Sequence, residues 1–310
     1  MDAVRLFFLL SNPFFILTKM YNWDIIKEKF KPSGGTKMEQ TKLQELRQVA
    51  RQIRIGIIKS TNAAKSGHPG GSLSIADILA YLYFEEMNID PVNPAMPERD
   101  RFVLSKGHCA PGLYSALANR GYFPVEELTT LRKIGARLQG HPDMTLTPGV
   151  DMSAGSLGLG ISSAAGMALA GKIDNQDYRV YTIVGDGESE EGQVWEACMF
   201  ASHYKLDNLC VIVDWNGLQI DGPVTEVMNP TPHDKKLEAF GFHVISIDGH
   251  DFDQIEAAFQ EARAVKGKPT AIVAKTVKGK GVSFMENKVN WHGAAPNDEQ
   301  CALALAELNA

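Results

Sequence analysis

The chain has few cysteines, and their spacing argues against a disulfide framework or a zinc site. Only four occur in 310 residues, and no two of them form a Cys-x-x-Cys pair. Such wide, irregular spacing is typical of reduced thiols in a cytosolic protein. The four are Cys109, Cys198, Cys210 and Cys301. We therefore expect a cytoplasmic protein without structural disulfides.

Excess positive charge and long apolar runs are also missing. The formal net charge is −6, whereas nucleic-acid binding depends on lysines and arginines that neutralise phosphates, so we expect no nucleic-acid partner. Two apolar runs, residues 6–10 and 14–17, are separated by a Ser-Asn-Pro sequence. Neither approaches the about 20 residues needed to cross a bilayer, so we expect no membrane span.

Residues 1–37 differ in pattern from the rest of the chain. Gly34 and Gly35 lie shortly before Met38, and their codons can read as a ribosome-binding sequence. We therefore expect Met38 to be the native start and residues 1–37 to be a non-native or disordered extension. The alternative is a secretory signal peptide, but no small-residue cleavage site follows the apolar run.

From Lys42 onward the sequence alternates between helical and strand patterns. A helix with apolar residues at three- and four-residue steps ends at the glycine-rich residues 66–71, and a second helix should follow with Ser72 or Ser74 as its cap. Later apolar runs, mostly separated by helical patterns, predict a doubly wound α/β domain over residues 38–310. Its sheet should be mostly parallel, with helices on both faces. The runs cover residues 101–105, 179–184, 208–213, 243–247 and 270–276.

Oxygen-bearing side chains follow two of the expected strands. Gly185, Asp186 and Gly187 come after the run at 179–184, and Asn216 comes after the next run. A strand–helix–strand connection returns the chain to the same sheet edge, where ligands bind in such folds. A carboxylate, an amide and a nearby backbone carbonyl suit Mg²⁺, Ca²⁺ or Mn²⁺. Gly187 would let phosphate oxygens approach the backbone.

The Gly-Asp-Gly turn followed after 28 residues by asparagine resembles the metal and diphosphate motif of thiamine diphosphate enzymes. By itself Gly-Asp-Gly is a common turn, and Asn216 at the next strand end is what gives it weight. The resemblance implies thiamine diphosphate as cofactor, with Asp186 and Asn216 as metal ligands. It also implies that Leu218 offers its backbone carbonyl to the metal.

Four further motifs make the chain similar to transketolases. They contain His68, His108, His141 and His292, and they read SGHPG at 66–70, LSKGH at 104–108, GHPD at 140–143 and WHG at 291–293. A single loop histidine is more often solvated or capping. The four together imply imidazoles that line the channel to the reactive carbon, bind substrate oxygens and move protons. His108 and His292 should also approach the diphosphate.

Three further residues have roles implied by the same resemblance. Gly155 and Leu157 would present backbone groups to the aminopyrimidine. A Rossmann reading of residues 155–160 lacks the preceding strand that such a loop requires. Glu191 matches a glutamate that connects two cofactor sites, or else is a solvated acid at a helix start. One interpretation of Cys109 is a redox-sensitive thiol, and a small space-filling residue is the simpler one.

The sequence lacks the activating glutamate and aromatic residues that hold the pyrimidine in this family. The resemblance therefore implies an amino-terminal transketolase subunit, active with a separate carboxyl-terminal subunit as an α2β2 assembly. The implied reaction transfers a two-carbon ketol unit from a ketose or its phosphate to an aldose or its phosphate. Alternatives are the α subunit of a 2-oxoacid dehydrogenase, a half of a deoxyxylulose-phosphate synthase, and a non-catalytic cofactor-binding subunit.

Overall fold

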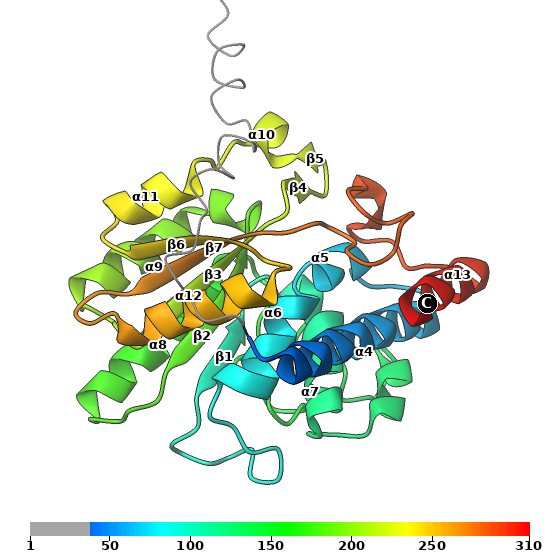
Figure 1. The fold of residues 1–310 in the computed structure, drawn as a ribbon, viewed down its shortest axis with the longest axis horizontal. Helices are drawn as coiled ribbons and strands as arrows, with labels where there is room; N and C mark the ends of the chain where they lie inside the picture. Colours follow the sequence, from blue (N-terminus) through cyan, green and yellow to red (C-terminus); the bar gives the residue numbers. More distant parts are fainter. Residues whose placement is uncertain (1–37) are drawn as a thin grey trace, which may run out of the picture. The chain divides into compact units, whose positions relative to one another are not determined.

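The structure is a computed structural model, and it describes residues 38–310. Its centre is a parallel sheet with the strand order β1-β2-β3-β7-β6 (Figure 1). The strands are β1 (Arg101–Leu104), β2 (Val180–Gly185), β3 (Leu209–Trp215), β7 (Thr270–Lys275) and β6 (His243–Asp248). This confirms the predicted doubly wound sheet, and all of its strand pairs are parallel. The strands β4 (Leu218–Gln219) and β5 (Gly222–Pro223) form a separate antiparallel hairpin.

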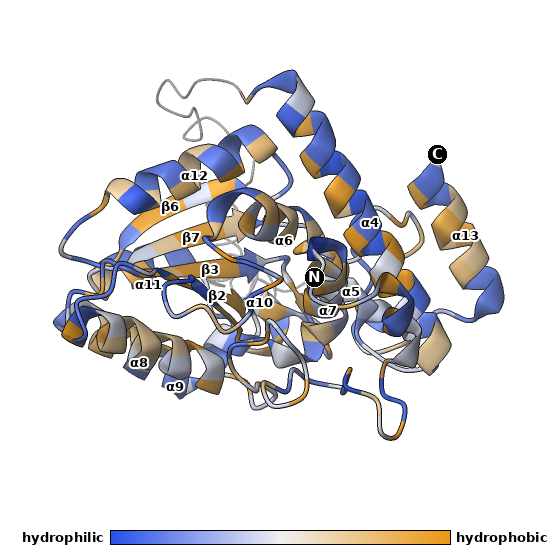
Figure 2. Ribbon diagram, turned by 90° about the horizontal axis from the view of Figure 1, so that it is seen from below, coloured by the Kyte–Doolittle hydropathy of each residue, from blue (hydrophilic) through white to orange (hydrophobic). Residues whose placement is uncertain are grey.

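Helices cover both faces of the sheet. One layer contains α4 (Gln40–Ala64), α6 (Ala76–Tyr81), α7 (Ala110–Arg120) and α12 (Phe252–Ala264), and the other contains α8 (Leu159–Ile173) and α9 (Gly192–His203). Along β2, Tyr181 and Ile183 pack into the first layer, whereas Val180 and Val184 pack into the second. Figure 2 shows the apolar strands between the two layers. Both strand faces are buried, which explains the unbroken apolar runs in the sequence.

Shorter helices complete the fold around this sheet. The final helix, α13 (Asp298–Asn309), packs against α4. The elements α10 (Val224–Val227) and α11 (His233–Ala239) connect the hairpin to β6, and a π-helical turn (Leu82–Glu86) continues α6. Within residues 38–310, no helix is long and apolar enough to cross a membrane. Residues 1–37, and the predictions made for them, lie outside the described residues.

The sheet register aligns the carboxyl ends of the strands. Gly185 at the end of β2 pairs with Asp214 of β3, and Trp215 of β3 pairs with Lys275 at the end of β7. Leu104 ends β1 beside Ile183, so the turn that follows β1 starts at the same edge. The loops after four strands therefore converge there, as expected for a ligand site in this class of sheet.

The segment after α4 differs from the prediction. A short helix, α5 (Pro69–Leu73), begins at a proline, whose fixed φ suits the first helical position. The expected cap at Ser72 or Ser74 is wrong. Ser72 lies inside α5, and the Ser74 hydroxyl donates instead to the Asp214 carboxylate at 2.8 Å. The Ser74 hydroxyl therefore binds the buried Asp214 carboxylate and does not cap a helix.

We predict that a chain starting at Met38 is as stable as the full chain. The Met38 side chain is buried in the core, and its backbone nitrogen donates to the Asp253 carboxylate at 2.9 Å. Both contacts persist in the shortened chain, where the nitrogen becomes an ammonium group. Thermal unfolding should give matching melting temperatures, and a fall of more than about 4 °C would contradict this prediction. A control chain starting at Glu39 loses both contacts and should melt earlier.

Candidate functional site

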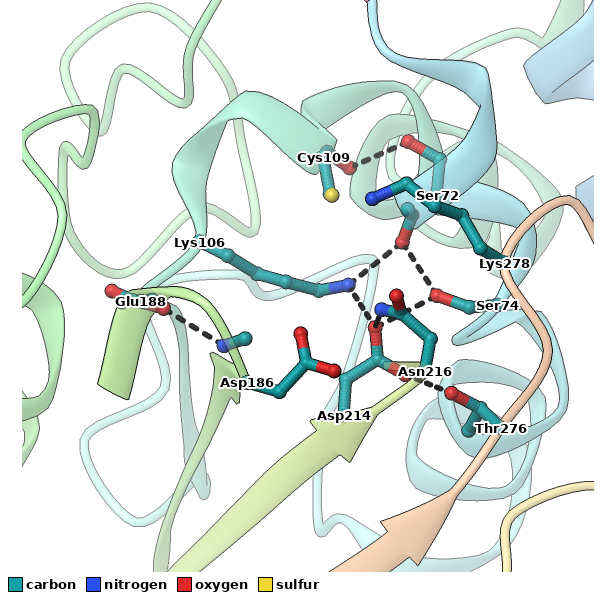
Figure 3. Close-up of polar contacts among 12 residues, drawn as sticks. Ser72, Ser74, Lys106, Cys109, Asp186, Glu188, Asp214, Asn216, Thr276 and Lys278 are labelled. Carbon is teal, nitrogen blue, oxygen red and sulfur yellow. Dashed lines mark hydrogen bonds and ion pairs between the residues drawn. The ribbon is translucent and has the colours of Figure 1, made fainter. Parts of the chain in front are cut away.

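Asp214 is fully buried near the end of β3 and connects the segments that form the site. Its carboxylate accepts hydrogen bonds from Ser74 at 2.8 Å, Lys106 at 2.6 Å and Asn216 at 2.9 Å, and also from Thr276 (Figure 3). Burial alone would raise the pKa of Asp214, but the Lys106 ammonium and these hydrogen bonds hold the pKa below its usual value. Asp214 is therefore an ionised anchor shared by four loops.

Lys106 supplies the charge that balances Asp214. Its side chain is buried, and its ammonium group also donates to the backbone oxygen of Gly71 at 2.7 Å. Burial opposes the charged form, but the carboxylate of Asp214 outweighs it and raises the pKa of Lys106. Cys109 lies beside this pair, and burial raises the pKa of its thiol. This favours the interpretation of Cys109 as a space-filling residue over a reactive one.

Asp186, which follows β2, is a second buried carboxylate with a different environment. Its Oδ1 accepts from the backbone nitrogen of Gly187 at 2.9 Å, and its other oxygen accepts from that of Gly217. Within residues 38–310, no cationic side chain forms an ion pair with it. Burial, followed by the negative charge of Asp214, raises the pKa of Asp186 to about 6. A bound cation would relieve both effects, so this carboxylate suits a metal ligand.

Asn216 and Leu218 lie on either side of Gly217, whose backbone nitrogen donates to Asp186. The amide nitrogen of Asn216 donates to Asp214, which leaves its Oδ1 to accept from the backbone nitrogen of Leu218 at 3.1 Å. The Leu218 carbonyl oxygen accepts from Lys278 at 2.8 Å. The structure thus brings the three predicted ligand residues together. Their carboxylate, amide and carbonyl oxygens are the donor set that Mg²⁺ and Ca²⁺ prefer.

Glu188 connects the loop at residues 185–187 to the loop at residues 155–160. Its Oε1 accepts from the Ser105 hydroxyl at 2.6 Å and from the backbone nitrogen of Gly158 at 2.9 Å. Its Oε2 accepts from the backbone nitrogen of Gly185 at 2.9 Å. Glu188 is itself buried. One side chain therefore fixes the spacing between the loop predicted to face the diphosphate and the loop predicted to face the pyrimidine.

Three of the four predicted histidines form a tight cluster. The ring centroids of His68 and His108 are 5.1 Å apart, those of His68 and His292 are 5.7 Å apart, and those of His108 and His292 are 5.2 Å apart. Lys278 Nζ lies 2.9 Å from His292 Nδ1. Because an ammonium can only donate, His292 Nδ1 accepts, and the ring proton of the neutral imidazole is on Nε2.

Burial keeps these imidazoles neutral. It is the largest cause of lowered pKa values, to about 4 for His68 and His108 and to about 3 for His292, and neighbouring positive groups lower them further. The pKa of His141 is also lowered, first by burial and then by Arg132. At neutral pH each ring offers one N–H donor and one acceptor nitrogen. Such pairs can bind hydroxyl and carbonyl oxygens and pass protons between them.

The remaining predicted residues lie at the exposed margin of the cluster. A methyl group on Gly155 would come within 3.4 Å of the His141 ring, so these two loops are adjacent. Leu157 is 36% exposed. Glu191 is exposed at the N-cap of α9, and its Cβ would lie 3.0 Å from a methyl group on Gly158. Their proposed contacts with cofactor stay predictions.

Sequence reasoning missed four charged residues at the site: Lys106, Glu188, Asp214 and Lys278. Each had a local signal. Lys106 and Glu188 lie inside motifs that were singled out for other residues, and Asp214 precedes Asn216 by two positions. Lys278 lies between β7 and the WHG motif in a Lys- and Gly-rich loop. What the sequence does not reveal is that all four are buried.

Comparison with known proteins agrees with this geometry. The family profile described as transketolase, thiamine diphosphate binding domain, matches residues 46–308. The chain is 50% identical over 270 residues to a 6-deoxy-6-sulfo-D-fructose transketolase subunit of a Clostridium species, covering 87% of this chain and 97% of that subunit. It is 47% identical over 261 residues to the transketolase of Pongo abelii, covering 84% of this chain and 41% of that enzyme.

Solved structures give the same result. The transketolase from Leishmania mexicana superposes with a TM-score of 0.81 at 35% identity, over 85% of this chain and 41% of that one. The architecture is therefore that of a thiamine diphosphate-binding domain. The chain belongs to the transketolase family, and it spans about two fifths of the length of the single-chain transketolases that it matches.

The neutral histidines generate a prediction about stability and pH. Folded His68 stays neutral down to about pH 4, whereas the unfolded chain takes up this proton near its ordinary pKa of 6.5. Stability is therefore lost as the pH falls from about 6.5 towards 4. His68→Gln cannot titrate, so its melting temperature should fall less than that of the wild type between pH 7.5 and pH 4.5. Equal falls would contradict the prediction, and His203→Gln on an exposed ring is the matched control.

Proposed function

We propose that this chain is the amino-terminal subunit of a two-subunit transketolase. It would transfer a two-carbon ketol unit from a ketose or its phosphate to an aldose or its phosphate, with thiamine diphosphate and a divalent metal. The observation that carries the proposal is the meeting, at one sheet edge, of the Asp186–Asn216–Leu218 oxygens and the cluster of neutral histidines. Similarity to transketolases favours this reaction over the 2-oxoacid dehydrogenase and deoxyxylulose-phosphate synthase alternatives.

The chemistry that thiamine diphosphate supplies when bound is a nucleophilic carbon that carries the two-carbon unit. Asp186, Asn216 and the Leu218 carbonyl would hold the metal, which we propose to be Mg²⁺, Ca²⁺ or Mn²⁺. Gly185 and Gly187 would keep the backbone open to the diphosphate, and His108 and His292 would approach it. Backbone groups of Gly155 and Leu157 would face the pyrimidine, and Glu191 would connect the two cofactor sites of the assembly.

The histidines would handle the oxygens and protons of the sugar. His292 directs Nδ1 towards Lys278, so Nε2 is the ring atom that would exchange a hydrogen bond with a substrate oxygen. His68 and His141 would bind the hydroxyl and carbonyl oxygens from the more open side. Neutral rings suit this task, since each can accept a hydroxyl proton or donate to a developing alkoxide without first losing a charge.

The proposed partner is a carboxyl-terminal subunit that carries the pyrimidine-binding part. Matched transketolases are more than twice the length that this chain covers. Exposed apolar side chains lie near the loop at residues 155–160 and along α9, where a second chain would bury them. They are Leu157, Leu159, Met199 and Phe200. Two copies of each chain, α2β2, would close the assembly with two-fold symmetry. Free, buried cysteines suit a cytoplasmic protein.

The distal end of the donor sugar is a separate question. Ketol transfer changes bonds only near the sugar carbonyl, and the described site residues are assigned to that end. The relative named as acting on 6-deoxy-6-sulfo-D-fructose shares 50% identity and matches over 97% of its length, so a sulfonated ketose is the second candidate donor. In either case we propose that the group at the far end of the sugar is recognised by the partner subunit.

The activity is tested by reconstitution. We expect the purified chain with thiamine diphosphate, Mg²⁺ and ketose donors to be inactive alone and active after addition of the subunit encoded beside it. Xylulose 5-phosphate, fructose 6-phosphate and 6-deoxy-6-sulfo-D-fructose should be compared with one aldose acceptor. Ketol transfer by this chain alone would contradict the two-subunit proposal, and decarboxylation of a 2-oxoacid by the pair would support the dehydrogenase alternative.

The metal site is tested by calorimetry. Asp186→Ala and Asn216→Ala should each weaken Mg²⁺-dependent binding of thiamine diphosphate to the reconstituted protein by at least about 100-fold. Losing one member of a buried charged set costs about 3–5 kcal/mol. The exposed Asp177, which precedes β2 at the opposite sheet edge, gives the matched control Asp177→Ala with unchanged affinity. Near-native affinity in either site variant, with a normal melting temperature, would refute the ligand assignment.

A further inference from the structure

Lys278 occupies an unusual position for a buried lysine. Its side chain is 2% exposed, and its ammonium group donates to the Leu218 carbonyl oxygen at 2.8 Å and to His292 Nδ1 at 2.9 Å. Among residues 38–310 it forms no ion pair with a carboxylate, unlike Lys106, which is paired with Asp214. Two neutral groups therefore hold a buried positive charge.

The balance of charge explains why a cation is tolerated there. Burial lowers the pKa of Lys278, and the negative charge of Asp186, a buried carboxylate without a contacting cation, is the largest influence that opposes this. Because charges interact over longer distances in a buried site than in water, the two groups stabilise each other without touching. The Lys278 ammonium thus places a positive charge near Asp186, as a bound metal ion would.

We propose that Lys278 is the resident cation of the metal site: it holds the Leu218 carbonyl and His292 until a divalent metal displaces it. This proposal rests on the proposed function, which assigns that carbonyl to the metal. A metal ligated at about 2.0–2.6 Å and an ammonium at hydrogen-bond distance on one oxygen would be close like charges in a buried site. The lysine has to leave, and its flexible four-carbon stem allows it to move.

Displacement also frees His292. While Lys278 donates to Nδ1, the tautomer of His292 is fixed with its proton on Nε2. When the ammonium leaves, Nδ1 loses its donor and the proton can move to either nitrogen. Metal arrival would therefore change the hydrogen bonds that His292 can make, and the catalytic ring would be released only in a site that contains metal.

The test is a titration of the purified full chain with Mn²⁺ in the absence of thiamine diphosphate, followed by calorimetry. Lys278→Met keeps the apolar stem and removes the competing ammonium, so Mn²⁺ affinity should rise by about 10-fold or more. Removing any nearby positive charge also favours a cation, and the control must account for this. Lys275→Met is the matched control, because the Lys275 ammonium is influenced by Asp186 but lies 4.7 Å over the Trp215 ring, with no hydrogen bond to Leu218.

The outcomes distinguish loss of the Lys278 hydrogen bond to Leu218 from the general effect of removing a nearby positive charge. A rise for Lys278→Met that clearly exceeds the rise for Lys275→Met supports displacement, as does wild-type-like affinity in Lys278→Arg, which retains the competing charge. Equal rises in both methionine variants, or no rise in Lys278→Met, overturn it. Melting temperatures show that each variant is folded.

Asp186→Ala in the Lys278→Met background distinguishes this proposal from the metal assignment beneath it. If the added affinity is lost with Asp186, the cation that gained access is bound at the proposed site. If the added affinity remains, the metal binds elsewhere, and both the ligand assignment and the displacement of Lys278 are wrong. Absence of Mn²⁺ binding in both the wild type and Lys278→Met also overturns the displacement proposal.

Discussion

The buried carboxylate of Asp214 is the constraint on which the rest of the site depends. It accepts hydrogen bonds from side chains on four separate loops, and each bond determines something else. It takes Ser74 away from helix capping, keeps Lys106 charged inside the protein, and turns the Asn216 amide so that the oxygen is directed away from it. Without Asp214, Lys106 would be an uncompensated buried charge, and the orientation of Asn216 would be lost.

The buried charged side chains of the site form two pairs that differ in how they are balanced. Asp214 and Lys106 form a closed pair that needs no ligand, whereas Asp186 and Lys278 lie apart and balance each other only at a distance. The histidines beside them remain neutral because they are buried among positive groups. The Asp214–Lys106 pair is therefore complete without a ligand, whereas Asp186 and Lys278 would be the charged groups available to the proposed metal and diphosphate.

The sequence predicted the layers of the fold well, for a physical reason. Strands buried on both faces must be continuously apolar, so β2, β3 and β7 appear as runs whose ends lie within two residues of those observed. The meeting of Asp186 and Asn216 at one sheet edge was predictable because the carboxyl ends of parallel strands converge there. The network around Asp214 was not found, since its donors lie 62 to 140 positions away, apart from Asn216, and no local pattern connects them. The helix start at Pro69 was not predicted, because the glycines of residues 66–71 were interpreted only as residues that end a helix.

Glu188 has a consequence for how the proposed two-subunit enzyme would form. By accepting from Ser105, Gly158 and Gly185 together, it sets the distance between two loops from inside one chain. The spacing of these loops would thus already be set before the proposed partner subunit binds. Association with that partner would then need no slow rearrangement of these two loops, so its rate would be set by diffusion and orientation.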